Sequence, residues 1–190
     1  LRFILKGWVE EFYINPKYYF TYYGFEWVTP FKENGMYILF GLLLLCTVFI
    51  TIGLFYRISM SLYFILFTYV ELIDKTYYLN HYYFISLLSF ILIFLPLHRS
   101  FSLDSFFGVC KKLNKVPSWC INIIKLQIGI VYFFAGIAKL NHEWLFEAQP
   151  LINWLKHLSD FPLIGQLLME DYTAYLFSWA GALFDLSIFF

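Results

Sequence analysis

The residues best suited to chemistry stand at the end of an apolar run, in the stretch VYFFAGIAKLNHEWL at 131–145. Lys139 closes this run, and Asn141, His142 and Glu143 follow it. An amine close to hydrocarbon is costly and is by default a functional-site candidate. Exclusion from water disfavours the ammonium form, and an uncharged lysine amine is a competent general base. The stretch therefore predicts proton abstraction by Lys139, and extension of its side chain to the lipid headgroups is the alternative for a lysine at this position.

A second polar cluster lies in the stretch YYLNHYYF at 77–84, where Asn80 and His81 stand between tyrosines. His81 is suited to orient or polarise the target of the amine, but a single interfacial histidine also suits a purely structural hydrogen bond. Lys125, near the start of its apolar run, is expected to extend to the headgroups. Asp185 is expected to make a hydrogen bond between helices or to lie in a polar interior.

The sequence carries no metal-binding motif. His142 and Glu143 have no second histidine at helical spacing, as a zinc or di-iron motif requires. A membrane desaturase would need several histidine boxes, and the chain has only 4 histidines. The 3 cysteines contain no C-x-x-C pair, which argues against a disulfide framework and a zinc site. They are Cys46, Cys110 and Cys120.

The composition is that of a membrane protein. Of 190 residues, 61% are hydrophobic and 24% aromatic, and only 14% are charged. A soluble domain is about half apolar and about a quarter charged. The formal net charge is zero, which removes the electrostatic basis for binding nucleic acid. Membrane lipid is the expected surrounding, and nucleic acid is not an expected partner.

Five apolar runs supply the elements that must position these residues, since a helix needs about 20 residues to cross a bilayer. Residues 1–35 mix Tyr, Trp and Phe with polar residues, which suits the headgroup region. We therefore predict an all-α fold, a polytopic integral membrane helical bundle with about five transmembrane helices. Residues 1–35 form an interfacial aromatic segment and 36–190 the transmembrane helical domain. The five runs are 36–56, 58–73, 82–97, 119–139 and 172–190.

The chain begins without an initiator methionine and stops inside an apolar run. We therefore expect an internal fragment, truncated at the C-terminus of its transmembrane domain. Alternating spans bring residues 1–35, the turn at 74–81 and the loop after Lys139 to one membrane face, so Lys139 and His81 are expected to face each other. The positive-inside rule makes this face periplasmic or lumenal, in a bacterial inner membrane or an endoplasmic-reticulum-like membrane. The short loops of the opposite face carry Arg57, Arg99, Lys111, Lys112 and Lys115.

Several stretches, in order along the chain, carry a resemblance to a known family. The chain resembles the vitamin K-dependent gamma-glutamyl carboxylases and their bacterial relatives in the horizontally transferred transmembrane (HTTM) domain family. The resemblance covers nearly all of the chain, and collinear matches are far more specific than any single motif. The stretches are FYINPKYYFTYYGFEWV (12–28), GLFYRIS (53–59), DKTYYLNHYYF (74–84), QIGIVYFFAGIAKLNHEWL (127–145) and WAGALFDLS (179–187).

The resemblance implies that Lys139, in the pattern AGIAKL, is the base that deprotonates reduced vitamin K, the hydroquinone. It implies a catalytic role for His81 in the same pocket, and we expect Asn80, Tyr132 and Asn141 to bind the substrate or cofactor. The hydroquinone anion reacts with O2, and an alkoxide formed on the way to the epoxide removes a γ proton from a peptide glutamate. CO2 then traps the carbanion as gamma-carboxyglutamate. The implied partners are a lipid-soluble quinol and a glutamate-containing protein or peptide, with no metal.

Two departures from the carboxylases leave alternatives open. The large soluble lumenal region of the carboxylases does not lie in this sequence, and Ala138 stands where they carry a second lysine. A relative that converts the quinol to its epoxide without carboxylating glutamate is therefore an alternative. A noncatalytic quinone- or lipid-binding membrane protein is another.

Overall fold

The computed structural model describes residues 1–32, 34–158 and 160–188, and these residues form helices joined by loops, without strands. The chain divides into two compact units, Leu1–Cys120 and Ile121–Phe190. Each unit is described by itself below.

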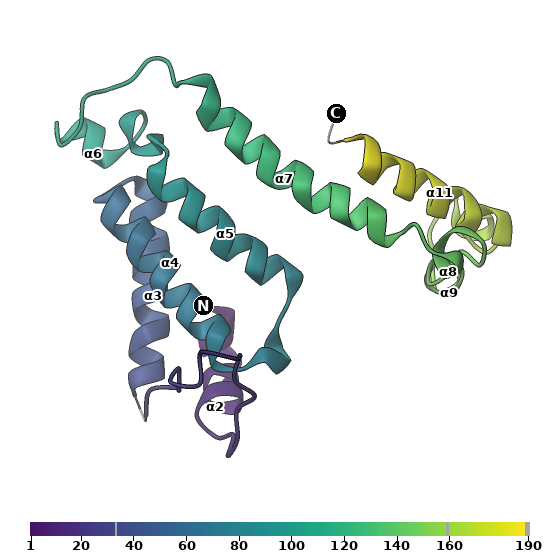
Figure 1. Cartoon of the computed structure of the whole chain (residues 1–190), viewed down its shortest axis with the longest axis horizontal. Coiled ribbons are helices and arrows are strands. Elements are labelled where there is room, and N and C mark those ends of the chain that lie inside the picture. The colour runs from purple at the N-terminus through teal and green to yellow at the C-terminus, as the bar shows by residue number, and fades with distance from the viewer. Residues whose placement is uncertain (33, 159, 189–190) are drawn as a thin grey trace. The chain divides into compact units, whose positions relative to one another are not determined.

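Three long helices form the body of the first unit (Figure 1). They are α3 (Gly35–Ile52), α4 (Tyr56–Ile73) and α5 (Asn80–Phe94), and α4 packs against both of its neighbours. The α3 sequence carries no charged residue, so its side chains can face lipid on every side without a desolvation cost. Its backbone polar groups are satisfied within the helix, which is the requirement for crossing hydrocarbon.

A tight turn joins α3 to α4, and the stretch GLFYRIS (53–59) forms this turn and the start of α4. Gly53 adopts a left-handed conformation with φ of 65°, and a Cβ there would lie 2.4 Å from the Cβ of Ser102. The carboxylate of Asp104 then accepts hydrogen bonds from the backbone N–H groups of Phe55 and Tyr56, at 2.8 and 3.0 Å. This carboxylate satisfies N–H groups at the start of α4 that have no partner within the helix. Asp104 lies in α6 (Leu103–Phe106).

The N-terminal segment folds onto one end of these helices. Its helix α2 (Trp8–Tyr13) contributes Val9 and Tyr13 to a buried core that also contains Met36 of α3 and Ile73 of α4, and α1 (Arg2–Leu5) packs against this core with partly buried side chains. The backbone N–H of Lys75 donates to the carbonyl of Phe20 at 2.9 Å. The loop after α2 is therefore tied to the turn that follows α4, which contains the short 3-10 helix η1 (Lys75–Tyr77).

The second unit is built around α11 (Asp171–Ser187). Its buried residues include Ala174, Ser178, Ala182 and Asp185, which recur every three or four positions and so form one stripe. Three short helices pack against α11: α8 (His142–Leu145), α9 (Leu151–Lys156) and α10 (Gly165–Leu168). The long helix α7 (Ser118–Ala138) ends just before α8. The C-terminal end of α7 contacts the C-terminal end of α11, where Gly136 lies against Leu186.

The structure confirms an all-α membrane fold, and it adjusts the number of spans. Within the described residues, α3, α4 and α7 are long and apolar enough to cross a membrane, with 18, 18 and 21 residues. The predicted span 82–97 becomes α5, which has 15 residues because Leu95, before Pro96, is extended. The predicted span 172–190 becomes α11 up to Ser187, and residues 189–190 lie outside the described part. The predicted number of about five is therefore not confirmed.

Candidate active site

The sequence after α7 folds into a turn that fixes the position of Lys139. Its backbone N–H donates to the carbonyls of Ala135 and Gly136, at 3.2 and 3.1 Å, so Lys139 completes the last turn of α7. Asn141 then caps α8: its side-chain oxygen accepts from the N–H of Trp144 at 2.8 Å, and its amide nitrogen donates to the carbonyl of Ala138 at 2.7 Å. Asn141 therefore links the end of α7 to the start of α8.

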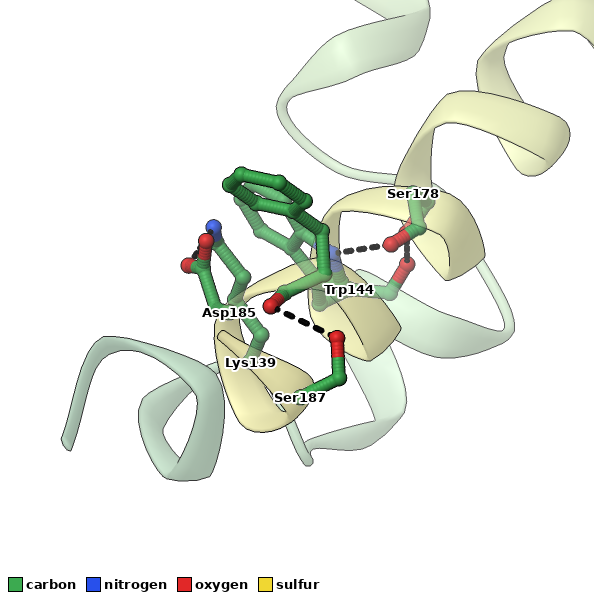
Figure 2. A network of polar contacts seen from close by, with 6 residues as sticks. Lys139, Trp144, Ser178, Asp185 and Ser187 are labelled. Atoms are coloured by element: carbon green, nitrogen blue, oxygen red, sulfur yellow. Dashed lines mark hydrogen bonds and ion pairs between the residues drawn. The ribbon is translucent and has the colours of Figure 1, made fainter. Parts of the chain in front are cut away.

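The Lys139 side chain points to α11, where its ammonium nitrogen donates to the carboxylate of Asp185 (Figure 2). The lysine side chain is 24% exposed and the aspartate side chain 9%. The same nitrogen lies 5.1 Å from the centre of the Trp144 ring, which is within the range of a cation–π contact. The amine is therefore held between a carboxylate and an aromatic face.

A close approach of two helices makes this contact possible. Gly136 is one turn before Lys139 on α7, and it is buried against Leu186 of α11. A Cβ at position 136 would lie 2.8 Å from two side-chain carbons of Leu186 and 3.0 Å from its backbone nitrogen. Glycine is therefore the residue that lets α11 bring Asp185 up to the end of α7.

Hydrogen bonds between α8 and α11 hold the tryptophan in place. The fully buried Ser178 donates its hydroxyl to the carbonyl of Trp144, and the Trp144 indole N–H donates back to the carbonyl of Ser178 at 3.0 Å. The indole N–H of Trp179 donates to the carbonyl of Leu145 at 2.9 Å. Since Ser178 and Asp185 share one stripe of α11, the element that supplies the carboxylate also positions the ring beside the amine (Figure 2).

The arrangement changes the chemistry expected for Lys139. Apolar surroundings alone favour an uncharged amine, whereas a carboxylate in contact and an aromatic face both favour the ammonium. The contacts therefore describe an ion pair. Asp185 makes the expected contact between helices, and its partner comes from α7 rather than from its own apolar run.

Tyr132 lies two helical turns before Lys139, on the same side of α7. Its ring packs edge-to-face on Phe184 of α11, with ring centres 6.1 Å apart. The structure thus brings Tyr132, Lys139 and Asn141 into the region where α7, α8 and α11 meet. Asn141 has both ends of its amide on backbone groups, so its observed contacts are those of a capping residue.

Asn80 and His81 belong to the first unit, as the first two residues of α5. Both are exposed, and the His81 ring packs edge-to-face on Tyr82 with ring centres 4.7 Å apart. Asp74, which opens the same turn, accepts from the backbone N–H and the hydroxyl of Thr76 at 2.9 and 2.8 Å. A pocket shared by His81 and Lys139 stays a prediction, because the two residues belong to separately described units.

Sequence reasoning did not predict the contacts that Trp144, Ser178 and Gly136 make around Lys139 and Asp185. Each had a visible signal: a tryptophan five residues after the lysine, a serine seven residues before Asp185 and so on the same helical face, and a glycine one turn before the lysine. Those signals gain meaning only once α7, α8 and α11 are brought together. The His142 side chain, by contrast, lies 3.3 Å from the exposed Glu147 carboxylate rather than in this cluster.

A model of the HTTM domain matches residues 1–190, the full length of the chain. The chain belongs to the HTTM domain family. This HTTM domain is accordingly a membrane protein related to vitamin K-dependent carboxylases or epoxidases. No solved structure is significantly similar to it.

Proposed function

We propose that this HTTM domain deprotonates a vitamin K-type hydroquinone with Lys139 and converts it with O2 into the epoxide. One observation carries the proposal: a lysine amine at the end of an apolar helix, in contact with a buried carboxylate and an indole face. A purely structural ion pair needs neither the aromatic face nor the hydrogen bonds that fix it.

The pair supplies a path for the proton. Lys139 gives its proton to Asp185, which leaves an amine lone pair free to accept the proton of the quinol hydroxyl. The lysine is then an ammonium again, and its charge stabilises the quinol anion that has formed. The Asp185 proton can return to bulk water when product leaves. In this scheme Lys139 is the catalytic base, and Asp185 is a positioning residue that accepts a proton.

The surroundings suit an oxygen-dependent reaction of a lipid-soluble substrate. Side chains of α7 before Lys139, such as Val131, Phe134 and Ile137, are exposed on the described surface and offer an apolar approach from lipid. The hydroquinone loses two protons and supplies the four electrons that reduce O2: one oxygen atom enters the epoxide, and the other leaves with the two protons as water. A site with little water protects the strong base formed during oxygenation from premature quenching.

We also propose that the strong base removes a γ proton from a peptide glutamate and that CO2 adds to the carbanion. In this scheme reduced vitamin K, O2 and CO2 are cosubstrates, His81 acts on the quinol, and Asn80, Tyr132 and Asn141 contact the substrate. We assign the reaction to the periplasmic or lumenal face of the membrane. These assignments rest on the resemblance to the carboxylases, and each of them can be tested separately from the formation of the epoxide.

Epoxide formation tests the first step. Purified protein in nonionic detergent, given reduced vitamin K and air, is expected to form the epoxide, measured by liquid chromatography. Lys139→Ala is expected to lose at least about a hundredfold of this rate, the usual contribution of a positioned acid or base. Lys125→Ala is the matched control, because Lys125 is an exposed lysine of the same helix. Full epoxide formation by Lys139→Ala would refute the assignment.

Ala138 favours a second candidate, a quinol epoxidase that does not carboxylate glutamate, because the carboxylases have a second cationic lysine at that position. Labelled bicarbonate and a glutamate peptide separate the candidates. Label in the peptide supports carboxylation, and epoxide without label supports the second candidate. Quinone binding without epoxide would instead identify a noncatalytic binding protein.

A further inference from the structure

A cavity in the first unit contains a carboxylate that the proposed reaction does not use. Glu71, two residues before the end of α4, lines a partly open cavity of about 170 Å³ and a second, more open cavity of about 490 Å³. Tyr22 and Tyr78 line both cavities as well. Glu71 therefore stands where a small aromatic chamber meets a larger apolar one.

One oxygen of this carboxylate has a partner. The Ser86 hydroxyl of α5 donates to Glu71 Oε2, and within the described residues no donor contacts Oε1. Glu71 is half-buried, so neither bulk water nor the protein fully compensates its charge. Asp74 also lines the smaller cavity, where Thr76 donates twice to its Oδ1, through its backbone N–H and its hydroxyl. Glu71 lines both cavities and accepts a single hydrogen bond among the described residues, so it is the carboxylate that a ligand extending through both cavities would meet.

The residues that line the two cavities favour a positively charged ligand. The smaller one is lined mainly by aromatic rings, and its lining contains the carboxylates of Glu71 and Asp74. Neither cavity has a lysine or arginine among its described lining residues. An anion would therefore meet two negative groups without a positive one. An organic cation meets a carboxylate and the negative faces of several aromatic rings, the arrangement that recognises quaternary ammonium groups.

The sizes and positions of the cavities define the rest of the ligand. A cavity of about 150 Å³ is enough for a molecule as large as benzene, so 170 Å³ accommodates one trimethylammonium group. The larger cavity adds Phe64, Leu72 and Leu87 as apolar walls, which suit a hydrocarbon chain. Glu71 is near the end of α4, a helix long and apolar enough to cross a membrane, and the ends of such a helix are expected at the level of the lipid headgroups.

We propose that the Glu71 pocket binds a quaternary ammonium group, either on a free small cation or on the headgroup of a choline lipid. The ammonium occupies the aromatic chamber beside Glu71, and any hydrocarbon chain follows the larger cavity toward the membrane. This binding does not depend on the proposed quinol chemistry, because it involves neither Lys139 nor turnover.

The test is equilibrium binding of radiolabelled tetramethylammonium to the purified protein in nonionic detergent. Glu71→Gln keeps the size of the side chain and an acceptor for Ser86 but removes the charge, and binding is expected to weaken at least about tenfold, equivalent to about 1.4 kcal/mol. Glu26→Gln is the matched control, because Glu26 is an exposed carboxylate of the same unit. It is expected to bind as the parent protein does.

A second pair of variants keeps the test valid if Glu71→Gln does not fold. Tyr78→Phe preserves an aromatic face and is expected to bind normally, whereas Tyr78→Leu removes it and is expected to weaken binding. The uncharged isostere 3,3-dimethylbutanol should not compete. Equal binding by Glu71→Gln, equal binding by Tyr78→Leu, or full competition by the uncharged isostere would each overturn the proposal.

Reconstitution distinguishes the two sources of the ammonium group. Nanodiscs of phosphatidylcholine should block the labelled cation, relative to nanodiscs of phosphatidylglycerol, if the pocket takes lipid headgroups. Equal binding in both nanodiscs would assign the pocket to a free cation. No binding in either nanodisc or in detergent would overturn the proposal, and the epoxide assay would be unaffected by that result.

Discussion

The contact between α7 and α11 gives the sharpest prediction, through Gly136→Ala. The new Cβ would lie 2.8 Å from Leu186 side-chain carbons and 3.0 Å from the Leu186 backbone nitrogen. Carbon atoms prefer separations of about 3.5 to 4.0 Å. A rotamer change can move the side chain away, but the backbone nitrogen moves only with its helix. We therefore expect α11 to shift by several tenths of an ångström, at an overpacking cost of about 1 to 3 kcal/mol.

The shift acts on the ion pair beside it. Asp185 is the residue just before Leu186, so its carboxylate moves away from Lys139 with the helix. Misplacement of a catalytic group by about 1 Å can cost a hundredfold in rate, and the smaller shift here is expected to lower epoxide formation by about tenfold. Alanine gains about 1 kcal/mol over glycine in a helix, which offsets part of the stability loss. The net loss of stability is therefore expected to be about 0 to 2 kcal/mol, beside a loss of about tenfold in rate.

Gly181→Ala in α11 is the matched control, because a Cβ there has no neighbouring atom within 4 Å. It is expected to keep full activity and to raise the midpoint of thermal unfolding slightly. Unfolding can be followed with a thiol-reactive dye, since Cys46 and Cys120 are buried in the folded protein. If Gly136→Ala matched Gly181→Ala in both rate and midpoint, the close approach of α7 and α11 would be refuted.

Three further predictions follow from other contacts. Asp185→Asn leaves Lys139 without its anionic partner and is expected to lower the free energy of unfolding by about 1 to 3 kcal/mol. The double variant Lys139→Met, Asp185→Leu is expected to recover this stability but to form no epoxide. A double variant that is both stable and active would contradict the roles of both residues. Ser178→Ala removes a buried hydroxyl donor to α8 and should lower stability by about 1 kcal/mol, with the exposed Ser187→Ala as a neutral control in the same dye assay. Burial and two nearby arginines lower the pKa of His98, although a nearby aspartate opposes them. His98 therefore takes up a proton more readily in the unfolded chain, so its contribution to stability is full above a pH of about 6.5 and is lost as the pH is lowered. His98→Phe should make the midpoint of thermal unfolding less dependent on pH in this range. An unchanged dependence of the midpoint on pH would refute the assignment to His98.

Much of the fold could be predicted because its signals are local. The uncharged run of α3 and the apolar run of α7 predict long helices from composition alone. The ends of the helices were harder, since they depend on single residues. Gly53 ends α3 earlier than the apolar run does, and Pro96 shortens α5 from one side.

The contacts that build the site could not be predicted, because they join distant residues. Lys139 could be selected from its unusual position in an apolar run, but its partner Asp185 lies 46 residues away. That pairing depends on how α11 crosses α7, which helical periodicity does not specify. The Asp104 contact with Tyr56, 48 residues apart, has the same character. The local sequence pattern therefore singles out Lys139, whereas its ion-pair partner Asp185 is found only from the packing of the helices.

The most direct test of the central assignment isolates proton removal from all later steps. Under anaerobic conditions the bound hydroquinone can lose its proton but cannot be oxygenated, and its anion has a distinct ultraviolet absorbance. The parent protein is expected to accumulate this anion, and Lys139→Ala is expected to hold the quinol in its neutral form. An anion spectrum of equal intensity in Lys139→Ala, with equal quinol binding, would contradict Lys139 as the base.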